Sequence, residues 1–498
     1  MSCTSAVDPR TAPTYYGHAV RHGLTRWGSR AFPPLPRLDV RARWALAGIV
    51  AAAALARLGW ALQVERPREL RDPALYLLLG EQLASGNGYT YPIEFQGTFD
   101  NFPTAYYPPG YPLFLTPLLW VARQLPGDVS IFGTAVGANV VLSVALVWLV
   151  FHLGRRLAGV AVGLVAAAAT AIWPNLVFHS GVVLTETLFL VLLVLMFLVA
   201  FATPGVARHP GTRRLVALGV LLGLVGLVRP VSLVVAPVFL LLWWSDGVGR
   251  AVRRTAVVAA VTVAVLLPWS VLSTIRMESP VLLSLNFGDN VCIGYRDGAN
   301  GRFALAPECF DGYDDIPRPE SETERQADNI DRALTYLGDH PASVVTQMPA
   351  RARYTLESDS DGLEAAHDYG AHPLFGDPLD DLLRFGANAF YAVVTLLAIG
   401  GVAVVVRRGA WQDRRWHVLV LAAPVSLVSP LLTFGDPRFK MPIYPTLAVC
   451  AAVAVVALAR RGPVFDGDDA VDGPGGDATA APAQSTGAAE KDEVVSPA

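Results

Sequence analysis

The sequence predicts an all-helical protein that crosses a membrane many times, and two observations carry this prediction. Of its 498 residues, 53% are hydrophobic and only 16% are charged, with a mean hydropathy of +0.41, which is too apolar for a soluble domain of this length. The apolar residues also come in runs of about twenty, the length that a helix needs to cross a hydrocarbon core. The alternation typical of membrane β-strands is absent from the sequence.

The placement of the arginines predicts the orientation of these spans. The first apolar run follows Arg37, Arg41 and Arg43. It begins too far along the chain for a cleaved signal peptide, so we expect a signal anchor with a cytoplasmic N-terminus. From there every second connection is basic, which fits about ten spans with both termini inside. The basic connections hold Arg155, Arg156, Arg208, Arg213, Arg214, Arg250, Arg253, Arg254, Arg407, Arg408, Arg414, Arg415, Arg460 and Arg461. The expected spans are 44–62, 130–151, 157–173, 183–201, 215–229, 230–244, 255–274, 385–406, 416–432 and 442–460.

One membrane domain, residues 44–461, is expected between two loose cytoplasmic ends. Residues 1–43 are expected to be mostly disordered, and so is the tail 462–498, because its Ala, Gly, Asp and Pro cannot bury a core. Two outer connections are long, 63–129 and 276–384, and the second carries about half of the 42 acidic residues. These two outer loops are where a reaction would be housed.

The cysteines and the absence of known binding motifs limit the kinds of site that the sequence can predict. Cys292 and Cys309 both fall in the second outer loop, where an oxidising compartment permits a disulfide, although two free thiols are equally compatible with the sequence. The sequence contains no CxxC, HExxH, phosphate-binding loop or dinucleotide fingerprint. We therefore expect no metal, no cofactor and no nucleic-acid partner.

The first outer loop begins with RELRDPALYLLLGEQLASGNGYTYP, in which Asp72 precedes Pro73. This pair predicts a helix that starts with Asp72 as its N-cap and runs to Gly86 along the membrane surface. Capping alone would explain Asp72. A carboxylate at the mouth of a span is also placed to act as a general base for a hydroxyl nucleophile.

The next stretch, NFPTAYYPPGYP at residues 101–112, holds four prolines and three tyrosines. The prolines predict a stiff, extended ribbon, and the tyrosines predict hydroxyl groups at the interface. An aromatic belt that anchors the loop would account for Tyr106 and Tyr107 without any further role. The apolar helix that follows is expected to be broken by Pro117.

The segment HSGVVLTETLFLVLLVL carries His179 and places Glu186 just inside an apolar run. A carboxylate at that depth is costly unless it is paired or functional, although the dipole at a helix N-terminus lowers the cost. Both a capping role and a functional role remain open for Glu186.

Cations stand at the outer ends of other spans. Arg229 precedes a proline in GLVGLVRP, and Arg438 and Lys440 follow Asp436 in FGDPRFKMPIYP. Snorkelling of its side chain to the membrane surface would explain the position of Arg229. A local contact with Asp436 within the loop would explain Arg438. Several outer cations in a chain whose other arginines are mostly inside favour an anionic partner, and a phosphate fits arginine best.

In their order, the stretches RDPALYLLLGEQLASGNGYT, PTAYYPPGYPLFLTPLLW, LTETLFLVLLVL, LVRP and DPRFKMPIYP resemble the multi-spanning glycosyltransferases of the GT-C superfamily. These include the protein mannosyltransferases and the lipid A aminoarabinose transferases. The resemblance covers roughly residues 44–461. It implies a GT-C bundle of transmembrane helices with two large extracytoplasmic loops that bear interfacial helices. It also implies transfer of a sugar from a polyprenyl-phosphate donor to a cell-envelope glycan, lipid or protein hydroxyl, usually with inversion, on the outer face of a bacterial plasma membrane.

The resemblance assigns roles to the polar residues. Asp72 would accept the proton of the acceptor, and Glu186 would orient the acceptor or share that role. The donor phosphate and its headgroup would be held by Arg229, Arg438, Lys440, His179, Tyr106 and Tyr107. A phosphate bound by cations is a good leaving group, so the chemistry requires no metal.

Two departures leave the acceptor open. Protein mannosyltransferases carry two adjacent acids where this chain has Asp72 and Pro73, which argues against that branch. Aminoarabinose transferases carry a charged pair where this chain has Tyr106 and Tyr107. Two other classes stay as alternatives, a transporter or flippase of lipid-linked sugars and a structural scaffold. Transporters tend to show repeats and broken helices at the midplane, whereas the charges here gather at the outer ends.

Overall fold

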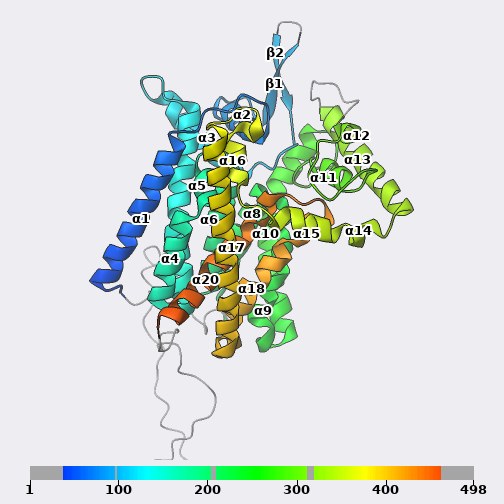
Figure 1. Cartoon of the computed structure of the whole chain (residues 1–498). Coiled ribbons are helices and arrows are strands. Elements are labelled where there is room, and N and C mark those ends of the chain that lie inside the picture. Colours follow the sequence, from blue (N-terminus) through cyan, green and yellow to red (C-terminus); the bar gives the residue numbers. More distant parts are fainter. Residues whose placement is uncertain (1–36, 96–97, 203–208, 311–318, 461–498) are drawn as a thin grey trace, which may run out of the picture.

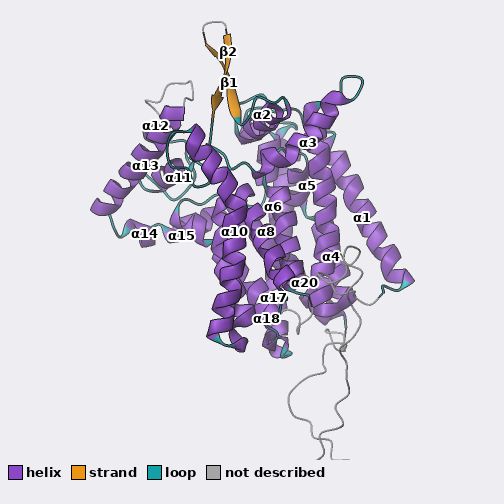
Figure 2. Ribbon diagram, turned by 180° about the vertical axis from the view of Figure 1, so that it is seen from behind, coloured by secondary structure: helices purple, strands orange, loops and turns teal. Residues whose placement is uncertain are grey.

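The computed structural model describes residues 37–95, 98–202, 209–310 and 319–460, which form a predominantly helical bundle (Figure 1). Within these ranges the strands are β1 (Thr90–Phe95) and β2 (Thr98–Pro103), an antiparallel hairpin in which Thr90 pairs with Pro103. Figure 2 shows this hairpin projecting beyond one end of the helices. The predictions for residues 1–36, Arg208, Arg461 and the tail fall outside the described ranges.

The prediction of a multi-spanning helical membrane protein is confirmed. Among the described residues, six helices are long and apolar enough to cross a membrane. They are α1 (Val40–Ala61), α4 (Ile131–Ile172), α10 (Val248–Arg276), α17 (Asp377–Arg407), the pair α18 (Arg414–Ser426) and α19 (Val428–Leu432), and the pair η5 (Pro437–Ile443) and α20 (Tyr444–Ala459).

Helix α4 contains two of the predicted spans, because the chain turns back on itself in its middle. Ala158 and Gly159 leave the helical conformation, and Gly159 has a φ of 87°. A Cβ atom on Gly154 would lie 3.1 Å from the Cα atom of Gly163, which places the two halves side by side. The predicted spans 130–151 and 157–173 are thus the two arms of one helical hairpin.

Three other predicted spans correspond to shorter helices. Residues 183–201 contain α6 (Glu186–Ala200), and 215–229 overlap α8 (Thr212–Val228). Residues 230–244 form the 3-10 helix η1 (Pro230–Phe239), followed by α9 (Leu240–Trp243) and η2 (Trp244–Asp246). An ordinary α-helix was expected in this last region. Pro237, inside this helix, lacks the N–H group that an α-helical ladder would use there, which is a physical reason for the difference.

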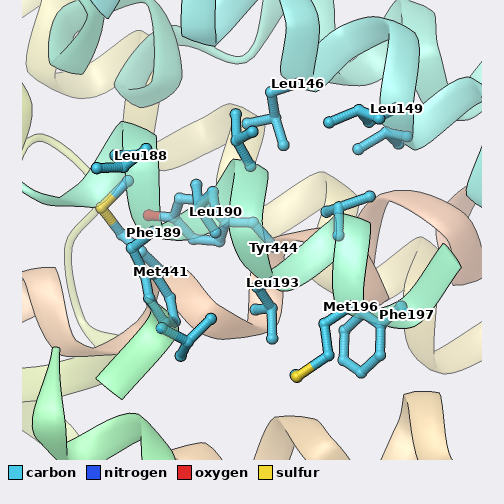
Figure 3. Packing of buried hydrophobic residues seen from close by; sticks show 14 of the residues in the cluster. Leu146, Leu149, Leu188, Phe189, Leu190, Leu193, Met196, Phe197, Met441 and Tyr444 are labelled. Atoms are coloured by element: carbon cyan, nitrogen blue, oxygen red, sulfur yellow. The ribbon is translucent and has the colours of Figure 1, made fainter. Parts of the chain in front are cut away.

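Helix α6 lies at the centre of the core. Thirteen of its fifteen residues are buried. Figure 3 shows Leu188, Phe189 and Leu193 from α6 among Leu146 and Leu149 from α4 and Met441 and Tyr444 from the C-terminal segment. By contrast only a minority of the residues in the apolar parts of α1, α10 and α17 are buried, as is typical of helices that face lipid.

The two ends of the bundle differ in chemistry. At one end Arg415 donates to the carbonyls of Arg156 (3.1 Å) and Ala202 (3.4 Å), and Arg156 donates to the carbonyl of Leu198. Connections that the arginine pattern predicts to be cytoplasmic therefore meet in space. The other end carries α2 (Asp72–Ala84), α3 (Gly110–Gln124), α16 (Asp361–Ala366) and the hairpin (Figure 1).

Two local predictions for the first outer loop were wrong. Helix α2 has Arg71, not Asp72, at its N-cap and ends at Ala84 instead of Gly86. Helix α3 continues through Pro117. A proline removes only one hydrogen bond from a helix, and the packing of Leu115 and Leu119, both fully buried, holds this helix together.

The second outer loop folds into a series of helices. These are α11 (Phe287–Gly294), α12 (Pro307–Phe310), α13 (Pro319–Asp339), α14 (Ser343–Thr346), α15 (Met348–Leu356), α16 and the turn η3 (Asp368–Gly370). A disulfide between Cys292 and Cys309, which the sequence left open, joins α11 to α12. A short helix α5 (Pro174–Ser180) follows α4, and η4 (Ala410–Gln412) joins α17 to α18.

Candidate functional site

Asp72 stands in the first turn of α2, and its carboxylate is held by residues from two other parts of the chain. Oδ1 accepts a hydrogen bond from the Tyr107 hydroxyl (2.6 Å), and Oδ2 accepts one from Nη1 of Arg438 (2.8 Å). The side chain makes no capping bond to its own helix and is 32% exposed. The carboxylate is therefore fixed in direction and still open to a substrate.

The neighbours of Asp72 keep it ionised. Partial burial acts to raise the pKa of the carboxyl group, but the charge and hydrogen bond of Arg438 and the hydrogen bond of Tyr107 outweigh it. The charge of Arg229 acts in the same direction. As a result the pKa of Asp72 lies below its ordinary value, and the group is a carboxylate at neutral pH.

The ribbon 101–112 is fixed by the second outer loop as well as by its prolines. Glu322 of α13 accepts hydrogen bonds from the Thr104 hydroxyl (2.6 Å) and the Ala105 amide (3.0 Å). Tyr106 donates to Asp289 of α11 (2.7 Å). These bonds set the position from which Tyr107 reaches Asp72. Sequence reasoning missed Asp289 and Glu322, because acidic residues are common in this loop and none stands out.

Glu186 and Arg229 form a buried ion pair behind Asp72. Nη1 of Arg229 lies 2.8 Å from Oε1 of Glu186, whose side chain is only 3% exposed. The guanidinium group lies 5.8 Å from the ring centres of Phe189 and Phe439, a cation–π arrangement. A buried carboxylate at the start of α6 is thus tolerated because it has a partner, since an unpaired one would be strongly destabilising.

Arg438 links three segments. Asp436 accepts from its backbone amide (2.9 Å), and Nη1 donates both to Asp72 and to the Tyr369 hydroxyl (3.2 Å). Tyr369 has a φ of 55° and the preceding Asp368 a φ of 49°, a left-handed conformation that is uncommon outside glycine. Sequence reasoning missed Tyr369. The only signal in its surroundings, HDYGAH, is a glycine that suggests a turn, and nothing there points to the tyrosine itself.

Lys440 and His179 lie in a separate buried cluster. The ammonium group of Lys440, fully buried, lies 3.1 Å from Oδ1 of Asp359 and donates to the Ser358 carbonyl (2.6 Å). Nε2 of His179 lies 2.8 Å from Oδ2 of Asp361. The structure therefore places these two residues among acids of the second outer loop, where they join α5 and η5 to α16, whereas the Asp72 carboxylate is bound by Tyr107 and Arg438.

No set of three or more His, Cys, Asp or Glu side chains in the part of the chain that the structure describes is arranged to hold a metal ion. The expectation that no metal or cofactor takes part stays a prediction.

Comparisons with known proteins add a set of distant structural similarities. No protein-family model matches this chain, and neither does any curated protein. A crystal structure of the Archaeoglobus fulgidus oligosaccharyltransferase aligns over 84% of this chain and 50% of its own, with 12% identity and a TM-score of 0.47. The archaeal oligosaccharyltransferase AglB from the same organism, in complex with an inhibitory peptide and a dolichol-phosphate, aligns over 84% and 51%, with 14% identity and a TM-score of 0.44. ArnT from Cupriavidus metallidurans bound to undecaprenyl phosphate aligns over 84% and 79%, with 15% identity and a TM-score of 0.38.

These similar structures are GT-C proteins, the superfamily that the sequence resembles. The chain spans about half the length of the archaeal oligosaccharyltransferases. At these identities and TM-scores the similarity says nothing about the activity of this chain. By its own helices, this chain is a multi-spanning, predominantly helical membrane protein.

Proposed function

We propose that the protein transfers a sugar from a polyprenyl-phosphate donor to a hydroxyl group of a cell-envelope glycan, lipid or protein, on the outer face of the plasma membrane. The observation that carries the proposal is Asp72, a partly exposed carboxylate held against Arg438 at the end of the bundle opposite the arginine-rich connections. Two of the similar structures hold a polyisoprenyl phosphate, which is the lipid carrier without a sugar.

The reaction is a single displacement. The acceptor oxygen forms a bond to the anomeric carbon of the sugar while the bond from that carbon to the phosphate oxygen breaks. The bonding electrons leave with the polyprenyl phosphate, and the acceptor proton moves to the carboxylate of Asp72. Attack opposite the leaving phosphate inverts the anomeric centre.

Arg438 has two roles in this scheme. In the structure it donates to Asp72, which weakens that carboxylate as a base. A donor phosphate competes for the same guanidinium group, whose five N–H donors suit a phosphate. When the phosphate binds, Asp72 loses part of this stabilisation and its pKa rises, so donor binding strengthens the base. Arg438 then stabilises the departing phosphate.

The remaining candidate residues support these two groups. Arg229 borders a small pocket with Ser429 and Phe439, from which its charge adds to that of Arg438, while Glu186 keeps it in place. Tyr106 and Tyr107 border the donor headgroup. We assign Lys440 and His179 to the substrate site indirectly: they anchor the segment that presents Arg438.

Replacement of Asp72 by Asn tests the proposal, because Asn keeps the size of the side chain but cannot accept the proton. In membranes supplied with polyprenyl-phosphate sugars, Asp72→Asn should reduce transfer by about a hundredfold or more at unchanged expression. Asp128→Asn, an exposed acid in the same outer loop, is the matched control. Undiminished transfer by Asp72→Asn contradicts the proposal. Movement of the intact lipid-linked sugar across vesicles without covalent change would instead indicate a transporter.

A further inference from the structure

Arg351 of α15 is a fully buried cation that has no part in the reaction scheme. Nη1 donates to the carbonyl of Leu431 (3.0 Å), and Nη2 donates to the carbonyl of Gly294 (2.8 Å). The same two nitrogens also donate to the Tyr295 hydroxyl (3.0 Å) and the Gln347 side chain (3.0 Å). These acceptors are neutral oxygens, so what Arg351 does must be read from the backbone that it binds.

The two carbonyl groups show which parts of the chain this arginine joins. Gly294 ends α11, and Leu431 lies in the last turn of α19. Carbonyl groups at a helix C-terminus lack partners inside the helix and carry partial negative charge, so a guanidinium group is a favoured partner for them. Arg351 therefore fastens the second outer loop to the segment that leads from α19 into η5.

That segment, residues 433–435, is enclosed by the second outer loop. Phe434 is only 2% exposed and packs in the cluster around the disulfide between α11 and α12. Gly435 donates to the carbonyl of Gly301 (2.7 Å). It also lies so close to α15 that a Cβ atom on it would collide with the carbonyl oxygen of Arg351. Because these contacts are tight, the segment moves only if its neighbours in the loop move as well.

The enclosed segment runs directly into the residues that present Arg438. Asp436 follows Gly435, and its carboxylate accepts a hydrogen bond from the Arg438 amide (2.9 Å). The guanidinium group of Arg438 in turn donates to Asp72 (2.8 Å). A misplacement of about 1 Å in such a group can cost most of its effect on a bound substrate. The position of the segment therefore decides where Arg438 meets a phosphate.

We infer that Arg351 is a positioning residue for Arg438: it holds residues 431–435 against the second outer loop and so keeps the guanidinium group of Arg438 where a donor phosphate binds. The inference rests on the proposed function and deepens it, because it makes the second outer loop part of the phosphate site. Arg351 itself touches no substrate, so its effect on phosphate binding must depend on Arg438.

Binding of sugar-free undecaprenyl phosphate to the full-length protein tests the inference without any transfer step. Native mass spectrometry of the protein from nanodiscs with graded contents of this lipid gives the fraction bound, with undecaprenol as the comparison without a phosphate. Arg351→Met should weaken binding by about tenfold, because Arg438 is no longer held in place. Arg353→Met is the matched control on the same helix. Arg353 is 74% exposed and pairs with Glu357 (3.0 Å), so this variant should bind like the wild type.

An Arg438→Gln background separates positioning from general damage to the fold. With Arg438→Gln present, Arg351→Met should change the affinity by less than about twofold, since the group that it positions is already gone. If Arg351→Met does not fold, Arg351→Lys takes its place. It keeps the charge but loses the planar fork, and should weaken binding by about threefold when Arg438 is intact and leave it unchanged in the Arg438→Gln background.

Two results overturn the inference alone: wild-type affinity in the folded Arg351 variant, or an equal loss of affinity with and without Arg438→Gln. Wild-type affinity in Arg438→Gln by itself is a different failure, because it contradicts the phosphate assignment of the proposed function and the inference with it.

Discussion

The carboxylate of Asp72 is both partly exposed and held by two hydrogen bonds, one from a tyrosine of the same outer loop and one from an arginine 366 residues later. A base that is fixed in direction but accessible suits proton transfer from a hydroxyl group. The pairing also gives Arg438 a structural role: it is the counter-charge of Asp72 as well as the group that we assign to the donor phosphate.

The pH dependence of transfer should depend on the hydrogen bonds that Tyr107 and Arg438 donate to Asp72, because they set its pKa. Asp72 acts as a base only when ionised, and in the protein without donor its lowered pKa means that this form is lost only at a pH below the ordinary range of an aspartate. At limiting donor concentration, where the rate reports the free protein, transfer measured from about pH 8 down to about pH 5 should therefore show no acid limb from Asp72. At saturating donor the limb should lie at higher pH, because the bound phosphate raises this pKa. Tyr107→Phe removes one stabilising hydrogen bond, so the pKa rises and any acid limb moves to higher pH.

Tyr336→Phe on α13 is the control for this measurement, because the same change there is far from Asp72 in sequence and makes no contact with it. An acid limb that is unchanged in Asp72→Glu, or that shifts equally in both Phe variants, would contradict the assignment of the base.

Sequence reasoning found some of these residues and missed others for a physical reason. Asp72, Glu186, Arg229 and Arg438 were visible because a charge beside an apolar run is costly and therefore conspicuous. Tyr369, Asp359 and Asp361 lie in a long polar loop, where such residues are common. Their importance arises from partners that are distant along the chain.

At the scale of elements, helices α17 and α20 approach each other through Gly401. A Cβ atom there would lie 1.8 Å from the carbonyl oxygen of Cys450, whereas one on the neighbouring Gly400 would lie 3.9 Å from the Ala454 side chain. The helices can meet this closely because one glycine faces the partner, as in other membrane helix pairs that pack through small residues.

Gly401→Ala should therefore destabilise the bundle by about 1–3 kcal/mol, because the helices must separate to admit the methyl group. Gly400→Ala is the matched control and should be at least as stable as the wild type, since alanine favours the helix more than glycine does. Thermal unfolding in detergent, monitored by size-exclusion chromatography, gives the melting temperature of each variant. Equal melting temperatures for the two variants would show that the α17 and α20 contact is not as close as described.

For the whole molecule, the separation of two chemically different ends implies an orientation. Arg156 and Arg415 meet at one end, and Asp72, Glu186 and Arg438 gather at the other. Since arginine-rich connections stay in the cytoplasm, we expect the end that carries Asp72 to face outside.

Cysteine labelling in intact cells tests this orientation. In a background with Cys3→Ser and Cys450→Ala, a membrane-impermeant maleimide should label Leu282→Cys, which is 86% exposed in the loop after α10. Arg407→Cys, exposed at the end of α17, should be labelled only after the cells are permeabilised. The reverse pattern would place the candidate site in the cytoplasm.

The sequence by itself determined the helical membrane class, the approximate spans and the charged residues at their ends, because the cost of placing charge and unpaired backbone in lipid leaves few alternatives. The tertiary structure alone decided which charges pair. It joined Asp72 to Arg438 and Glu186 to Arg229, placed Lys440 and His179 in a cluster with Asp359 and Asp361, and brought Tyr369 to Arg438. These pairings depend on how helices far apart in the chain pack together, and local patterns of hydrophobicity and charge carry no information about that packing.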